Sequence, residues 1–165
     1  MSPCVISVSP RKWRELLFHS QGDPHHQRSG AVRLSALMQV APDTAAVNWL
    51  DRQPAESIWI TSVTLFEARL GIALLARGKR QRALAAAFDQ LLSQDFGNRV
   101  LDFDTSAALE AAALAATRQK AGHPVDMRDT QIAGIALARR ASIATRNVRH
   151  FEDLRVPVVN PWKGD

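Results

Sequence analysis

The sequence predicts an α/β fold in which a parallel sheet is flanked by helices. Short apolar runs, typical of buried strands, alternate along the chain with longer segments of helical period. The strand runs lack a polar face, as expected where helices cover both sides of a sheet. The chain has 165 residues, of which 46% are hydrophobic, so it can form one compact domain with a real core.

The regular pattern begins near residue 33, and the chain divides there. Residues 1–32 are rich in Ser, Pro, His and Arg and show no sustained period. We therefore expect them to form a poorly ordered N-terminal extension. Residues 33–165 are expected to form the folded domain.

In the first half of this domain, the sequence pattern predicts one strand with helices before and after it. "LSALMQ" (34–39) has helical period, and "DTAAVNWLDRQ" (43–53) begins with Asp43 as a candidate N-cap. "SIWITS" predicts a strand over 58–61. Two helices follow, "SVTLFEARLGIALLARG", which ends near Gly78, and "KRQRALAAAFDQLLSQDFG".

The second half continues the alternation. "RVLDFD" predicts a strand over 99–103, and the Ala-rich helix "TSAALEAAALAATRQKAG" ends at Gly122. The helix "DMRDTQIAGIALARRA" precedes a strand over 142–145. "VPVVNPW" gives the last predicted strand, over 156–159.

Net charge and cysteine content limit the kinds of partner and the cellular compartment that we expect for this chain. The formal net charge of +5 fits an acidic partner such as RNA, although many cytosolic proteins share this balance. Cys4 is the only cysteine, which excludes an internal disulfide and fits the reducing cytoplasm. No apolar run approaches the roughly 18 residues of a membrane span, and the N-terminus lacks the apolar core of a signal peptide. A cytoplasmic protein without membrane contact is expected.

Glu67 lies among apolar positions of a predicted helix. Val63, Phe66, Leu70 and Leu74 surround it at helical spacing, so its carboxylate is predicted on a buried face. Burial is costly unless a cation or a hydrogen bond meets the carboxylate. Glu67 is therefore either an ion-pair partner at the edge of the apolar stripe or a ligand in a metal site.

Asp129 begins the buried face of a later helix. Ile132 and Ala133 follow it at helical spacing, so Asp129 is predicted to point inward. Asp126, preceded by Pro124, fits the N-cap of that helix. Asp129 either complements the helix dipole in the first turn or binds a metal, and its inward position favours the metal.

Two further polar side chains stand at strand ends. Asn147 follows the run "SIAT" closely, where it is either a turn residue or part of a site. Asp104 follows "VLDF" and fits the N-cap of the next helix. Because ligand sites in open α/β sheets lie at the carboxyl ends of the strands, we expect these oxygen-bearing side chains to converge there.

Converging carboxylates indicate a hard divalent cation, Mg²⁺ or Mn²⁺. Such a cation lowers the pKa of a bound water and stabilises the charge that builds up during attack on a phosphate. Arg146 and Arg149, beside Asn147, are candidate contacts for a nucleic-acid backbone. Lys79 and Arg80 in "ARGKRQR" are a second candidate, although that run also fits a solvated helix junction.

These segments resemble the PIN-domain family, specifically the VapC-type and FitB-type toxins of bacterial toxin–antitoxin pairs. The similarity extends from about residue 34 to residue 162 through "LSALM", "WITSVTLFEARLGIALLARGKR", "DFGNRVLDFDTSAA", "GHPVDMRDTQIAGIA", "ATRNVRHFEDL" and "VPVVNPW". The resemblance implies a PIN-like parallel sheet and a Mg²⁺- or Mn²⁺-dependent endoribonuclease, usually a homodimer held inactive by a small antitoxin. By position, it implies that Glu67, Asp129 and Asn147 are catalytic and that Glu67 and Asp129 bind the metal.

The chain departs from the family at the first metal site. The family opens with an apolar strand ending in Asp-Thr-Asn, and the position of that Asp corresponds here to Gly30, in "RSGAVRL". We therefore expect the usual first strand to be missing or altered. Either the reading frame is shifted or its start codon misassigned, or the N-terminus is degenerate. Two functions follow: a ribonuclease impaired in this chain, or a non-catalytic protein that binds an antitoxin or partner subunit.

Overall fold

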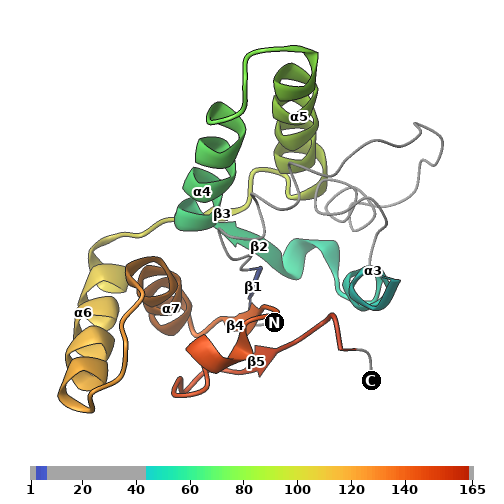
Figure 1. The fold of residues 1–165 in the computed structure, drawn as a ribbon. Coiled ribbons are helices and arrows are strands. Elements are labelled where there is room, and N and C mark those ends of the chain that lie inside the picture. The colour runs from blue at the N-terminus through green and yellow to red at the C-terminus, as the bar shows by residue number, and fades with distance from the viewer. Residues whose placement is uncertain (1–2, 7–43, 164–165) are drawn as a thin grey trace.

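Five parallel strands form a single sheet in the computed structural model, which describes residues 3–6 and 44–163. The strand order is β3-β2-β1-β4-β5, and each neighbouring pair is parallel (Figure 1). The strands are β1 (Cys4–Ile6), β2 (Ile58–Thr61), β3 (Val100–Leu101), β4 (Ser142–Ala144) and β5 (Val158–Val159). The predicted parallel α/β fold is confirmed.

The central strand β1 overturns one expectation. Val5 pairs with Trp59 of β2 and with Ile143 of β4, and its side chain is fully buried. Of the two expected alternatives for the usual first strand, missing or altered, the first is therefore wrong, because Cys4–Ile6 forms a strand, and the expected poor order does not hold for these three residues. The run "CVI" after Pro3 is three residues long and carries too little pattern to predict a strand. The rest of the expected extension, the boundary at residue 33 and the predicted helix over 34–39 lie outside the described residues.

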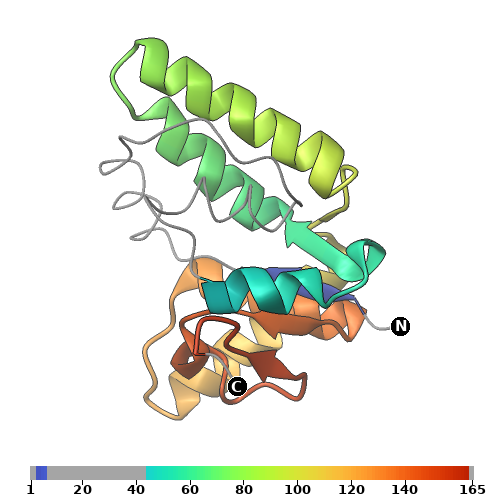
Figure 2. The ribbon, with the colours of Figure 1, turned by 90° about the vertical axis from the view of Figure 1, so that its right-hand side faces the viewer.

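Helices cover both faces of the sheet (Figure 2). Alternate residues of β1 face opposite ways, because side chains in a strand alternate between the two faces. Cys4 and Ile6 join a core with α4, α5 and the π-helical turn η2, whereas Val5 joins a core with α6 and α7. The helical segments are α3 (Thr44–Asp51), η1 (Ala55–Ser57), α4 (Ser62–Ala73), α5 (Lys79–Gln90), η2 (Leu91–Asp95), α6 (Thr105–Lys120), α7 (Met127–Arg139) and η3 (Val148–His150).

Gly134 allows α6 and α7 to pack closely. A Cβ atom on Gly134 would lie 2.4 Å from the carbonyl oxygen of Ala107 and 2.7 Å from the Cβ of Ala111. Both distances are shorter than van der Waals contact, so only glycine fits there without movement of α6. The close contact fixes α7, whose first turn carries Asp129.

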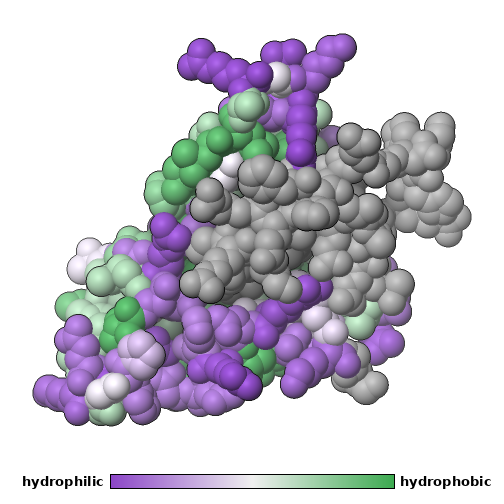
Figure 3. All heavy atoms as spheres, viewed as in Figure 1, coloured by the Kyte–Doolittle hydropathy of each residue, from purple (hydrophilic) through white to green (hydrophobic). Residues whose placement is uncertain are grey.

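The helices α4 and α5 form a hairpin that projects from the sheet (Figure 1). Phe66, Leu70 and Leu74 are 56%, 37% and 71% exposed, and apolar atoms line the outer side of this hairpin in Figure 3. The prediction that these three residues share a buried face with Glu67 is wrong. Glu67 is buried with the opposite side of α4, beside Val63. Hydrophobic spacing cannot distinguish a face that packs on the core from one that faces solvent.

Within the described part of the chain, no helix is both long enough and apolar enough to cross a membrane.

Candidate active site

Asp126 and Asp129 lie at the start of α7 and have different roles. The Oδ1 atom of Asp126 accepts hydrogen bonds from the backbone N–H groups of Arg128, at 2.9 Å, and Asp129, at 3.1 Å. Asp126 is therefore the N-cap, as predicted. The Asp129 carboxylate is not used in capping, and the residue is only 8% exposed. Its inward position is confirmed.

Asp129 is linked to Asn147 through His150. The His150 Nδ1 atom contacts the Oδ2 atom of Asp129, and the Asn147 Nδ2 atom lies 2.7 Å from the same Nδ1. The Asn147 backbone N–H donates to Thr145 Oγ1 at 3.1 Å, which fixes the turn after β4. Sequence reasoning assigned no role to His150. The available signal was its position three residues after Asn147, within one turn.

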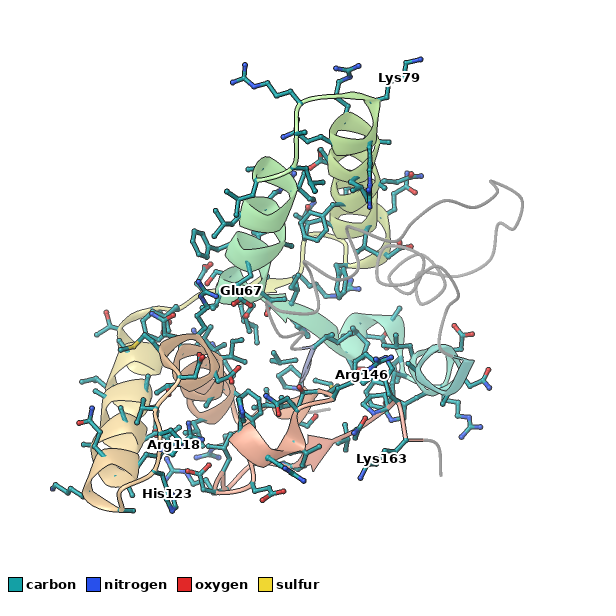
Figure 4. The ribbon with its side chains drawn as sticks, in the orientation of Figure 1. Glu67, Lys79, Arg118, His123, Arg146 and Lys163 are labelled. Atoms are coloured by element: carbon teal, nitrogen blue, oxygen red, sulfur yellow. The ribbon has the colours of Figure 1, made fainter. Side chains whose placement is uncertain are left out.

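Glu67 is held in α4 beside α7, at the base of the hairpin (Figure 4). It is 4% exposed, and neither carboxylate oxygen has a hydrogen-bond partner among the described residues. Within this part of the chain, it forms an ion pair with Arg128, whose Nη1 atom is 3.4 Å from Oε1. Burial raises the pKa of Glu67 to about 7; Arg128 opposes this shift, whereas Asp129 and Asp126 add to it.

Asp104 lies outside this group of side chains. It caps α6 by accepting a hydrogen bond from the Ala107 N–H at 3.0 Å, as predicted. Ser106 Oγ and Arg139 Nη2 also donate to its carboxylate, at 2.8 Å and 2.5 Å. The backbone hydrogen bond from Ala107, followed by those from Arg139 and Ser106, holds the pKa of Asp104 well below its usual range. Its carboxylate is already committed to structural partners.

Arg118 braces the segment that carries Asn147 and His150. Its buried guanidinium donates to both carboxylate oxygens of Asp153, at 2.8 Å and 2.7 Å, and to the His150 carbonyl at 2.7 Å. Its Nη1 atom also lies 3.4 Å from Thr130 Oγ1, in the first turn of α7. One cation thus connects α6, α7 and the turn after β4. Sequence reasoning missed this role, because a lone Arg in an Ala-rich helix gives no signal of it.

A cleft of about 310 Å³ opens beside Asp129. Its lining is strongly charged, and the residues are Arg118, His123, Pro124, Asp126, Asp129, Arg149, His150, Glu152 and Asp153. Of the four basic residues proposed from the sequence, only Arg149 lines this cleft. The guanidinium of Arg146 lies over the Trp162 ring at 5.1 Å, and Figure 4 shows Lys79 at the far tip of the α4–α5 hairpin, next to Arg80 in the sequence.

The donor atoms suit a hard divalent cation. Glu67 and Asp129 offer carboxylate oxygens and Asn147 an amide oxygen, and no described residue donates a hydrogen bond to the buried Glu67 oxygens. A cation there would relieve the cost of burying that charge. Among the described residues, no group of three His, Cys, Asp or Glu side chains is gathered closely enough to hold a metal alone.

The PIN domain family model matches residues 35–156. The plasmid stability protein StbB of Pseudomonas syringae is 38% identical over 122 residues, covering 74% of this chain and 88% of that protein. The VapC ribonuclease Y4jK of Sinorhizobium fredii is 31% identical over 130 residues, covering 79% and 93%. The toxin FitB of Neisseria gonorrhoeae is 31% identical over 129 residues, covering 78% and 93%.

Solved structures agree with these matches. The crystal structure of FitAcB from Neisseria gonorrhoeae superposes with a TM-score of 0.71 at 30% identity, covering 80% of this chain and 95% of that one. A DNA-bound VapBC from Salmonella typhimurium gives a TM-score of 0.64, covering 98% of this chain and 99% of that one. At 21% identity, the second match supports the fold alone.

Proposed function

Because the chain belongs to the PIN-domain family, we propose that it is a metal-dependent endoribonuclease of the toxin type, acting in the cytoplasm. Relatives named as a VapC ribonuclease and as a toxin support this class. The observation that carries the proposal is the buried Glu67 carboxylate, which has no hydrogen-bond donor among the residues the structure describes and whose pKa is raised chiefly by burial and further by Asp129. Two buried carboxylates near each other call for a cation.

The proposed roles follow from the positions of the side chains. Glu67 lies in the second turn of α4, the helix that follows β2, Asp129 lies in the first turn of α7, and Asn147 follows β4. All three stand at the carboxyl end of the sheet, where ligands bind in open α/β folds. Glu67 and Asp129 would hold Mg²⁺ or Mn²⁺, and Asn147 would help to orient the attacking water. When bound, the cation would supply an activated water and offset charge on the phosphate.

Two groups of basic side chains would bind the RNA backbone, one near the metal site and one farther away. Arg149 lines the cleft beside Asp129, and Arg146 is three residues along the chain from it. Lys79 lies at the tip of the hairpin (Figure 4), Arg80 follows it in the sequence, and both are exposed. We propose that Arg149 and Arg146 act near the scissile phosphate, whereas Lys79 and Arg80 contact RNA farther away.

The metal site is incomplete in this chain. Gly30 stands where the family has its first Asp, and β1 is followed in the sequence by Ser7, also without a carboxylate. Fewer carboxylates mean weaker Mg²⁺ binding, because ligand charge offsets the dehydration of the cation. We therefore propose that cleavage is slow. The same observation favours the second candidate function, a non-catalytic PIN protein that binds an antitoxin or partner subunit.

Cleavage of a labelled single-stranded RNA by the full chain, with Mg²⁺ or Mn²⁺, tests the proposal. We expect slow cleavage that Asp129→Asn abolishes, while Glu152→Gln, an exposed carboxylate on the same cleft, leaves the rate unchanged. Ser7→Asp should accelerate cleavage if β1 occupies the family's first strand, and Gly30→Asp should not. Cleavage that survives Asp129→Asn would contradict the site. No cleavage by either the parent chain or Ser7→Asp would favour the non-catalytic function.

Two protein partners complete the proposal. A small antitoxin is expected to hold the chain inactive, in line with the FitAcB complex to which the chain is similar. We also propose a homodimer formed through the apolar stripe of Phe66, Leu70 and Leu74 on α4. Contiguous exposed apolar side chains typically mark protein–protein contacts.

A further inference from the structure

We propose that His150 is a nitrogen ligand of the metal site, and that it makes the site prefer Mn²⁺ to Mg²⁺. This inference rests on the proposed function, because it assumes that Asp129 binds a divalent cation. It adds a ligand of a different chemical kind to the carboxylate oxygens of Glu67 and Asp129.

The first argument is convergence on one nitrogen atom. The His150 Nδ1 atom touches the Asp129 carboxylate and lies 2.7 Å from the Asn147 amide nitrogen. Neighbouring ligands in an octahedral sphere with bonds of about 2.1 Å lie roughly 3 Å apart. The His150 nitrogen and the Asp129 carboxylate are therefore spaced almost as two ligands of one ion would be, and a small outward movement would admit the cation.

The second argument is that His150 is held by the fold. Its carbonyl oxygen accepts a hydrogen bond from the Arg118 guanidinium, which is 7% exposed and bonded to both oxygens of Asp153. The His150 side chain is 48% exposed, yet its backbone is fixed from the protein interior. A surface histidine placed by chance would lack such a brace.

The third argument is that the oxygen ligands on this chain are few. Neither oxygen of the buried Glu67 carboxylate accepts a hydrogen bond within residues 3–6 and 44–163, and the Asp of the family's first strand has no counterpart at position 30. An imidazole nitrogen would add a ligand without adding negative charge beside Asp129 and Asp126. Imidazole nitrogen suits transition metals, whereas Mg²⁺ favours oxygen ligands. A site that includes the His150 nitrogen therefore binds Mn²⁺ in preference to Mg²⁺.

A competing role for His150 predicts the opposite effect on affinity. If His150 only pairs with the Asp129 carboxylate, it competes with the cation, and its removal strengthens metal binding. If His150 is a ligand, its removal weakens Mn²⁺ binding. The sign of the change in Mn²⁺ affinity therefore distinguishes the two roles.

The test uses the full chain, Mn²⁺ and Mg²⁺, and the variant His150→Leu. His123→Leu is the matched control, because His123 lines the same cleft without contacting Asp129 in any described hydrogen bond. Mn²⁺ affinity is measured by electron paramagnetic resonance, and Mg²⁺ affinity by competition. Electron-spin-echo modulation shows whether a nitrogen atom is bound to Mn²⁺. Circular dichroism confirms that each variant is folded.

We expect nitrogen modulation in the parent chain and in His123→Leu, and its loss in His150→Leu. Mn²⁺ affinity should fall by about 10- to 100-fold in His150→Leu, because removal of residues that merely orient metal ligands already costs about that much. Mg²⁺ affinity should change much less. A second variant, His150→Asp, should bind Mg²⁺ more tightly than the parent chain, because an oxygen replaces the nitrogen.

Three results would overturn the inference in distinguishable ways. Mn²⁺ binding without nitrogen modulation, or tighter binding in His150→Leu, would reject His150 as a ligand and leave the proposed nuclease intact. Failure of the parent chain to bind Mn²⁺ at all would reject the metal site, and this inference with it. Nitrogen-coordinated Mn²⁺ in a chain that cleaves no RNA would support the inference and reject only the nuclease.

Discussion

Burial of a single carboxylate controls the electrostatics of this site. Glu67 lies in α4 with almost no exposure, and in the described part of the chain the Arg128 guanidinium, 3.4 Å away, is the cation that pairs with it. Its pKa is raised from 4.5 to about 7, chiefly by burial. Ionised Glu67 therefore opposes folding and favours cation binding at the same time.

At the residue scale, Glu67→Gln should remove a pH dependence of stability. The unfolded chain loses its Glu67 proton near pH 4.5 and the folded chain near pH 7, so the parent chain loses stability as pH rises between these values and not beyond them. The shift corresponds to about 3 kcal/mol at about 1.36 kcal/mol per pKa unit. Urea unfolding in metal-free buffer should show that the unfolding free energy of Glu67→Gln, relative to that of the parent chain, increases from pH 5 to pH 8. The increase should be up to about 3 kcal/mol.

Addition of Mg²⁺ at pH 8 provides the control for this prediction. It should stabilise the parent chain and leave Glu67→Gln nearly unchanged, because binding to the folded state alone raises stability. A constant difference in unfolding free energy between the two chains from pH 5 to pH 8 would contradict the raised pKa.

At the scale of elements, the contact between α6 and α7 sets the position of Asp129. The two helices approach so closely that Gly134 has no room for a side chain. Arg118 of α6 then reaches Thr130 of α7 and the His150 carbonyl. The site thus depends on helix packing as well as on its own residues.

Gly134→Ala should destabilise the chain even though alanine favours helices. The added methyl group would meet the Ala107 carbonyl at 2.4 Å, so α6 must move, and overpacking of this kind costs about 1–3 kcal/mol. The gain in helix propensity is about 1 kcal/mol. Gly78→Ala is the matched control, because its new Cβ would meet nothing closer than 4.0 Å. Thermal unfolding should show a Tm below that of the parent chain for Gly134→Ala and not for Gly78→Ala. An unchanged Tm for Gly134→Ala would mean that α6 and α7 can move apart at little cost.

At the scale of the whole molecule, the exposed stripe on α4 is the surface best suited to self-association. Leu70 lies at the middle of this stripe, four residues along α4 from Phe66 and from Leu74. Burial of such side chains against a second copy would contribute about 25 cal/mol per Å² of apolar area removed from water.

Leu70→Glu should convert a dimer into a monomer. Ala86→Glu places the same charge at an exposed position of α5, in the same hairpin, and should leave the dimer intact. Sedimentation equilibrium gives the mass of each species. A parent chain that is monomeric at high concentration, or a Leu70→Glu variant that still forms a dimer, would reject this interface.

The sequence alone determined the alternation of strands and helices, because hydrophobic period and helix caps are local properties. It also nominated Glu67 and Asp129, since an acid within an apolar pattern is visible without a structure. Tertiary structure decided what depends on neighbours distant in sequence. Cys4–Ile6 is a strand because it lies between β2 and β4, and the stripe of Phe66 is exposed because the core packs on the other side of α4. His150 meets Asp129 across 21 residues of chain only because α7 and the turn after β4 are folded side by side.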